Sequence, residues 1–78
     1  MYFDYSKLCG RIREKCKTQQ RFAKLMGIAR SSLSAKLNNY SEFTQQEINR
    51  ALTILDLSQY EIPEYFFKEI VQKSEQLK

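Results

Sequence analysis

Short polar, small and cationic side chains follow a tight turn near the middle of this 78-residue chain. Directly after Gly27-Ile28-Ala29 come the residues that could contact the base edges of double-stranded DNA: Arg30, Ser31, Ser32 and Ala35. The guanidinium of Arg30 can donate two hydrogen bonds to O6 and N7 of guanine, or it can contact a phosphate instead. Serines near the start of a helix often bind backbone amides rather than bases. A methyl group such as that of Ala35 can touch a thymine methyl or simply favour the helix.

A second group of side chains could bind the phosphates that flank such bases. Its members are cationic, hydroxyl-bearing or amide-bearing, and they lie on both sides of the turn: Gln19, Arg11, Arg13, Lys17, Arg21, Lys24, Ser34, Lys36, Asn38, Asn39 and Tyr40. Lysines and arginines on helix surfaces are often only solvated. We therefore expect only a few of these residues to contact phosphate.

The charge of the chain is divided unevenly between its two halves. Residues 1–40 carry nine Lys or Arg against two acids, a net charge of +7, whereas residues 41–78 carry four against seven, a net charge of −3. Small proteins often have uneven charge, but here the basic half also contains the turn and its candidate contacts. This coincidence favours a surface that binds nucleic acid.

The spacing around the turn predicts two short helices that cross closely. Ala23 is small enough for the crossing, Gly27 tolerates the positive φ of the turn, and Leu33 follows six residues later. The apolar side chains that would lock the two helices together are Phe22, Met26, Ile28 and Leu33. We expect the first of these helices to be capped by Thr18 and to end at Gly27, and the second to cover residues 30–38.

Further signals predict helices on either side of this pair. A helix over residues 6–16 is expected, capped by Asp4 or Ser6, with Gly10 at a close helix contact. Asn39 suits a left-handed stop, and Thr44-Gln45-Gln46-Glu47 is a capping box that starts another helix. The residues between 56 and 62 are expected to form a loop or a single turn.

The C-terminal residues allow two interpretations. Pro63 could open a helix through about residue 74, which we favour, whereas residues 65–71 are also rich in strand-forming types. Their apolar side chains either close the core or pair across a two-fold axis, and the candidate dimer contacts are Phe66, Phe67, Ile70 and Val71.

Several classes of protein are excluded by composition. The chain has no histidine, and Cys9 and Cys16 lie seven residues apart on one helix face, too far for a disulfide. We therefore expect no metal, no cofactor and no catalytic site, and we interpret both thiols as buried in a reducing compartment. Because the chain has no long apolar run and no signal peptide, we expect a cytoplasmic protein that does not bind a membrane. We also expect no small-molecule ligand.

The chain resembles the Cro/repressor class of helix-turn-helix proteins, also called the XRE family. The residues that carry the resemblance are Thr18-Gln19, Phe22-Ala23, Gly27-Ile28, Leu33-Ser34 and Leu37-Asn38. The resemblance covers roughly residues 6–57, and the flanking residues look like the small Cro-type proteins of temperate phages. It implies an all-α, five-helix, lambda-repressor-like domain that binds a palindromic DNA operator as a homodimer, with Gln19 as a phosphate clamp. Three positions depart from the Cro/repressor pattern. Ala29 replaces the usual cap, so that Ser31 could cap the helix instead and leave Arg30 outside it. Lys36 replaces an apolar residue, and Asn39 replaces glycine.

These features predict a single domain over residues 1–78, in which residues 63–78 form a tail for core closure or dimerisation. The function expected from the resemblance is that of a sequence-specific transcriptional regulator, a Cro-like repressor of a phage or prophage switch. The alternative is a protein-interaction module on the same fold, such as an antitoxin whose tail docks a partner.

Overall fold

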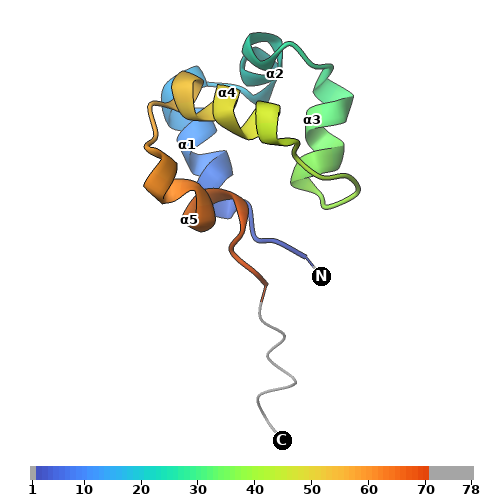
Figure 1. Cartoon of the computed structure of the whole chain (residues 1–78). Helices are drawn as coiled ribbons and strands as arrows, with labels where there is room; N and C mark the ends of the chain where they lie inside the picture. The colour runs from blue at the N-terminus through green and yellow to red at the C-terminus, as the bar shows by residue number, and fades with distance from the viewer. Residues whose placement is uncertain (1, 71–78) are drawn as a thin grey trace, which may run out of the picture.

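The computed structural model describes residues 2–70, which fold into five α-helices (Figure 1). They are α1 Ser6–Cys16, α2 Gln19–Met26, α3 Arg30–Leu37, α4 Gln45–Leu55 and α5 Ile62–Phe66, with a short 3-10 helix, η1, at Gln59–Glu61. The single β feature within these residues is an antiparallel bridge between Phe3 and Glu69. The expected all-α, five-helix fold is therefore confirmed. None of the described helices is both long and apolar enough to cross a membrane.

Local capping signals determine where α2 and α4 begin and where α2 ends. The Thr18 hydroxyl accepts a hydrogen bond from the backbone N–H of Arg21 at 3.1 Å, and Gly27 ends α2 with a left-handed φ of 77°. At the start of α4, the Glu47 N–H donates to the Thr44 hydroxyl and the Glu47 carboxylate accepts from the Thr44 N–H. Each of these predictions is confirmed, because capping depends only on neighbouring residues.

The ends of α1 and α3 also follow from short-range contacts. The Asp4 carboxylate accepts from both the N–H and the hydroxyl of Ser6, and these bonds lower the pKa of Asp4. Ala29 is the residue before α3 and offers no side-chain cap, yet α3 begins at Arg30, so the alternative cap at Ser31 is not used. Asn39 has the expected left-handed φ, 66°.

The core lies where α1, α2, α4 and α5 meet, and α3 packs against it through α2. Its buried side chains are Tyr5, Leu8, Ile12, Cys16, Phe22, Ala23, Met26, Leu33, Ile48, Ala51, Leu55, Tyr65 and Phe66. Figure 1 shows α4 crossing in front of α1 and α2, with α3 at the edge of the molecule. Of the four apolar residues expected to lock α2 to α3, three are buried, and Ile28 is half-buried against the core. This packing fixes the angle at which α3 presents its outer surface.

Gly10 does not lie at a helix contact. A Cβ placed on this residue would meet no heavy atom within 4 Å, so the expected close approach is wrong. By contrast, a Cβ on Gly27 would lie 3.3 Å from a guanidinium nitrogen of Arg50. The glycine that the structure needs is therefore the one in the turn.

The helix expected over residues 63–74 ends at Phe66, so this prediction is wrong beyond that residue. After α5 the chain runs antiparallel to the N-terminal segment, and the Ile70 N–H donates to the Tyr2 carbonyl at 3.1 Å. The Phe67 ring packs edge-on against Phe3 with centroids 5.6 Å apart. These contacts with the distant N-terminus replace further helical hydrogen bonds. Of the alternative strand over residues 65–71, the described residues form only the bridge at Glu69. Residues 71–74 lie outside the described part of the chain.

Candidate nucleic-acid interface

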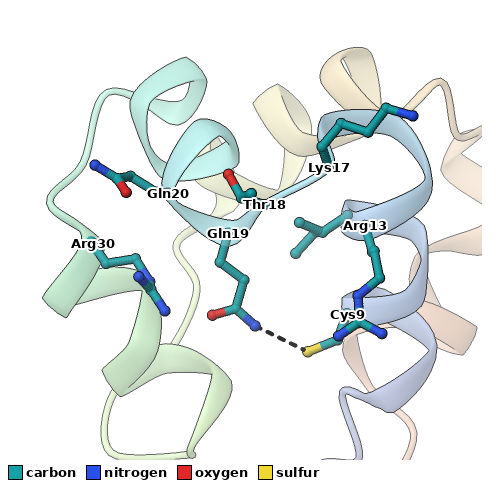
Figure 2. Close-up of a pocket in the computed structure, with 8 residues that line it drawn as sticks. Cys9, Arg13, Lys17, Thr18, Gln19, Gln20 and Arg30 are labelled. Atoms are coloured by element: carbon teal, nitrogen blue, oxygen red, sulfur yellow. Dashed lines mark hydrogen bonds between the residues drawn. The ribbon is translucent and has the colours of Figure 1, made fainter.

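An open pocket of about 420 Å³ lies where the end of α1 meets the starts of α2 and α3 (Figure 2). It is called here the α1–α2–α3 pocket, and it is lined by Cys9, Ile12, Arg13, Lys17, Thr18, Gln19, Gln20 and Arg30. Figure 2 shows the Arg30 side chain extending from α3 toward α1, with the Gln19 side chain between them and Lys17 pointing away from Arg30. Arg13, Arg30 and the Gln19 amide therefore line the pocket at the N-terminus of α2, where backbone N–H groups favour an anion.

Five cations on α1, α2 and α3, or directly after α1, are exposed and make no side-chain hydrogen bond or ion pair with another described residue. We call them the unpaired cations: Arg13, Lys17, Arg21, Lys24 and Arg30. Three of them line the α1–α2–α3 pocket, and the other two lie on α2, which begins at that pocket. This end of the molecule carries positive charge that no described carboxylate neutralises by direct contact.

Arg11 differs from these five, although the sequence places it in the same group. Its Nε donates to the Leu55 carbonyl at 3.0 Å and its Nη2 to the Asp56 carbonyl at 3.2 Å. A further bond joins its Nη1 to Glu14 at 3.1 Å. Arg11 therefore binds the carbonyl end of α4, which leaves its guanidinium little capacity for phosphate.

Lys36 is also held within the molecule. Its Nζ donates to the Glu42 carbonyl at 3.2 Å and lies 3.4 Å from a carboxylate oxygen of Glu47. The position where Cro/repressor proteins usually have an apolar residue is thus anchored here by polar contacts that connect the end of α3 to the start of α4.

The residues after α3 differ in whether their side chains are hydrogen-bonded within the molecule. The Asn38 amide donates to the Ser34 carbonyl at 2.8 Å, and the Asn39 amide binds the backbone of Phe3. Tyr40 is 84% exposed, and no described residue bonds to its hydroxyl. Of this stretch, Tyr40 has the side chain most accessible to a ligand.

The candidate base-contacting residues all lie on α3. Arg30, Ser31 and Ser32 are exposed on its first turn, whereas Ala35 is half-buried. The structure thus places Arg30 beside both the pocket and the two serines. Gln20, which the sequence did not single out, also lines the pocket, and its place in the first turn of α2 after the Thr18 cap was the available signal.

The two thiols have different surroundings. Cys16 is buried as expected, but Cys9 is only half-buried, and the Gln19 amide lies 3.9 Å from its sulfur (Figure 2). Burial raises the pKa of both thiols above the ordinary value of 9.0, so neither is a thiolate at neutral pH. Within residues 2–70, no group of three or more His, Cys, Asp or Glu side chains could hold a metal ion.

The candidate dimer contacts differ in how far their side chains are buried. Phe66 is 1% exposed and belongs to the core, where its ring packs edge-on against Phe43. Phe67 and Ile70 are 50% and 47% exposed. Val71 lies outside the described residues.

One solved structure that is similar to this chain is the solution structure of the modulator of repression (MOR) of the temperate bacteriophage TP901-1 from Lactococcus lactis. The two sequences are 43% identical over 92% of this chain and 97% of that one, and the TM-score is 0.77. No curated protein matches the chain. A family model described as "Protein of unknown function (DUF739)" matches residues 1–69, and the chain therefore belongs to this family.

Proposed function

We propose that this chain regulates phage repression by binding double-stranded DNA. The phage context comes from the MOR relative, a modulator of repression of a temperate bacteriophage. The observation that supports DNA as the ligand is the group of five unpaired cations around the starts of α2 and α3. Cations that a fold leaves without carboxylate partners on one part of its surface attract a polyanion.

In this proposal α2, the turn and α3 act as a helix-turn-helix. The start of α3 enters the major groove, where Arg30 contacts guanine and the neighbouring serines contact bases or phosphates. Gln19 and the N-terminal amides of α2 bind a backbone phosphate, and the remaining unpaired cations follow the same strand. Occupation of the operator then blocks polymerase, as in a Cro-like repressor.

The proposed functional unit is a homodimer on a palindromic operator. Two half-sites about 34 Å apart on one face of the duplex need two copies of α3. Phe67 and Ile70 support a self-association surface, because both are large, apolar and exposed at the end of the described chain.

Selection from a random duplex pool at near-physiological salt tests this function. Sequencing of the bound fraction should show an inverted repeat, and the half-site spacing would give the geometry of the dimer. If folded protein enriches no sequence, specific DNA reading is wrong. The Arg30→Ala variant, selected in parallel, should lose preference at one base pair in each half-site.

A second candidate is a protein-interaction module, favoured by an apolar cavity of about 200 Å³ away from the unpaired cations. Aromatic rings dominate its lining, which consists of Phe3, Tyr5, Glu42, Phe43, Ile48, Phe66 and Phe67. The salt dependence of DNA binding separates the two functions. With Arg30 on guanine, phosphate contacts by the other four unpaired cations predict a slope of about −3.6 in log K against log salt for each bound subunit, whereas a module that binds DNA only weakly gives a much shallower slope.

A further inference from the structure

The N-terminal segment, residues 2–4, is hydrogen-bonded on both of its edges. On one edge it pairs with residues 68–70: the Asp4 N–H donates to the Lys68 carbonyl at 2.6 Å, and the Ile70 N–H donates to the Tyr2 carbonyl at 3.1 Å. These two bonds flank the bridge between residues 3 and 69. Three residues at the start of the chain are thus paired with three residues that follow the last helix.

The opposite edge of the same segment is bound by one side chain. The Phe3 N–H donates to Oδ1 of Asn39 at 2.9 Å, and Nδ2 of Asn39 donates to the Phe3 carbonyl at 3.0 Å. This reciprocal pair is the pattern that a hydrogen-bonded residue of a neighbouring antiparallel strand would make. The Asn39 amide therefore replaces a strand, and it satisfies both backbone groups of Phe3.

Asn39 is at the same time part of the C-terminal end of α3. Its N–H donates to the Lys36 carbonyl at 3.2 Å, and the N–H of Tyr40 donates to the Ala35 carbonyl at 2.8 Å. Its left-handed φ of 66° is one that glycine adopts most easily and asparagine tolerates next best. Glycine would end the helix equally well, but only asparagine can also bind the backbone of Phe3.

We propose that residues 2–4 form a strap through which residues 68–70 hold the C-terminal end of α3, with Asn39 as the positioning residue. A ligand that displaced residues 68–70 from the strap would loosen Phe3, and the loosened strap would release Asn39. Tyr2, Phe67 and Ile70, which lie in or next to the paired segments, have exposed side chains, so this pairing lies at the surface of the molecule. The functional consequence rests on the proposed role of α3 in DNA binding, whereas the strap itself does not.

The strap can be tested without DNA by NMR and amide hydrogen exchange on the full chain. Ile70→Pro removes the N–H that donates to Tyr2, and Glu69→Pro is the matched control, because the Glu69 N–H bonds to no described residue. We expect Ile70→Pro to speed exchange of the Phe3 N–H about tenfold, the loss typical of a broken hydrogen bond. It should also move the signals of residues 37–40, while Glu69→Pro moves them little. Unchanged signals of residues 37–40 in Ile70→Pro would overturn the proposal.

Asn39→Gly tests whether the connection runs through the amide. Because glycine keeps the left-handed stop, the fold is expected to persist, which the dispersion of the remaining signals checks. Adding Ile70→Pro to Asn39→Gly should no longer move the signals of residues 37–40. An equal movement in both backgrounds would show that Asn39 is not the positioning residue.

DNA affinity gives a separate readout of the functional step. Ile70→Pro should weaken operator binding several-fold more in the Asn39 background than in the Asn39→Gly background, because only the effect on the proposed Ile70 self-association contact remains once the Asn39 amide is gone. If the NMR coupling is observed but Ile70→Pro weakens binding equally in both backgrounds, the strap holds and its proposed effect on DNA binding is wrong.

Discussion

Arg11 and Arg13 lie two residues apart on α1, yet the structure gives them different surroundings. Arg11 spans the gap to α4 and binds two carbonyls at its C-terminal end, whereas Arg13 lines the α1–α2–α3 pocket and bonds to no described side chain. Arg50 repeats the first arrangement, because its Nη1 donates to the Met26 carbonyl at the end of α2 at 2.9 Å. Helix C-termini carry unsatisfied carbonyls and partial negative charge, so a guanidinium there stabilises the fold. Basic charge in this protein therefore divides into cations that hold helices and cations that remain available to a ligand.

The largest expected effect is the loss of stability in Arg11→Met. Removing this guanidinium leaves the Leu55 and Asp56 carbonyls without their donor, which should lower the free energy of unfolding by about 1.5–3 kcal/mol. Urea denaturation followed by circular dichroism measures this change. Arg13→Met is the control and should change stability by no more than about 0.5 kcal/mol. Equal effects of the two substitutions would remove the distinction between the two groups of cations.

The second effect concerns base preference. Arg30→Ala should cost about 1–3 kcal/mol of discrimination at one base pair in each half-site, because the bidentate contact to guanine is lost. Competition binding with single-base variants of the selected operator measures the discrimination.

Lys24→Ala is the comparison for Arg30→Ala. It should weaken binding to all sequences alike and reduce the salt slope by about 0.9 for each bound subunit, or about 1.8 for the proposed dimer, as expected for one phosphate contact per subunit. Uniform weakening in Arg30→Ala as well would make Arg30 a phosphate contact.

The two glycines should respond in opposite directions. Gly27→Ala places a Cβ at a φ of 77° and 3.3 Å from the guanidinium of Arg50, so we expect a loss of stability of about 1 kcal/mol or more. Gly10→Ala adds a methyl group to an open site in the middle of α1 and should stabilise by about 0.5–1 kcal/mol. Thermal unfolding of both variants measures the difference. A destabilised Gly10→Ala variant would mean that the surface near α1 is not open.

The smallest effect is the reactivity of the thiols. Iodoacetamide at neutral pH should modify Cys9 faster than Cys16, because Cys9 is only half-buried whereas Cys16 is buried. Both should react more slowly than a free thiol, because burial raises the pKa of each thiol. Mass spectrometry of timed samples follows both sites, and bound duplex should slow the reaction of Cys9 in the pocket. Faster modification of Cys16 would contradict this order.

The same pKa shifts determine the response of stability to alkaline pH. The thiols lose their protons more easily in the unfolded chain than in the folded one, so their contribution to stability is full below the ordinary thiol pKa of 9.0. It is lost as the pH rises through the higher folded-state values. Replacing Cys9 with serine should weaken this decline.

The elements that could be predicted from sequence are those fixed by neighbouring residues. Thr18 and Thr44 define helix starts, and Gly27 and Asn39 define left-handed stops, because each cap depends on residues a few positions away. The pairing of the N-terminal segment with residues 68–70 could not be predicted in this way, since its partners lie at opposite ends of the chain.

The same limit applies to the candidate site. Arg11 and Arg13 look alike on a helix surface, and only the fold reveals that Arg11 meets a carbonyl 44 positions away. The sequence marks Lys36 as a departure from the Cro/repressor pattern, but its partners at residues 42 and 47 depend on how α3 approaches α4. The position of a cation in the sequence thus indicates a candidate, and its partners in the fold decide whether it is available.

The most direct test of the central claim is an NMR titration of the full chain with the duplex obtained by selection, because it locates the ligand on the molecule. We predict that the largest shifts occur at residues 13–32, around the α1–α2–α3 pocket and the start of α3, while the side-chain signals of Arg11 and Arg50 remain in place. Shifts confined to the aromatic cavity, or perturbation of Arg11 and Arg50 as strong as that of Arg13 and Arg30, would contradict the account.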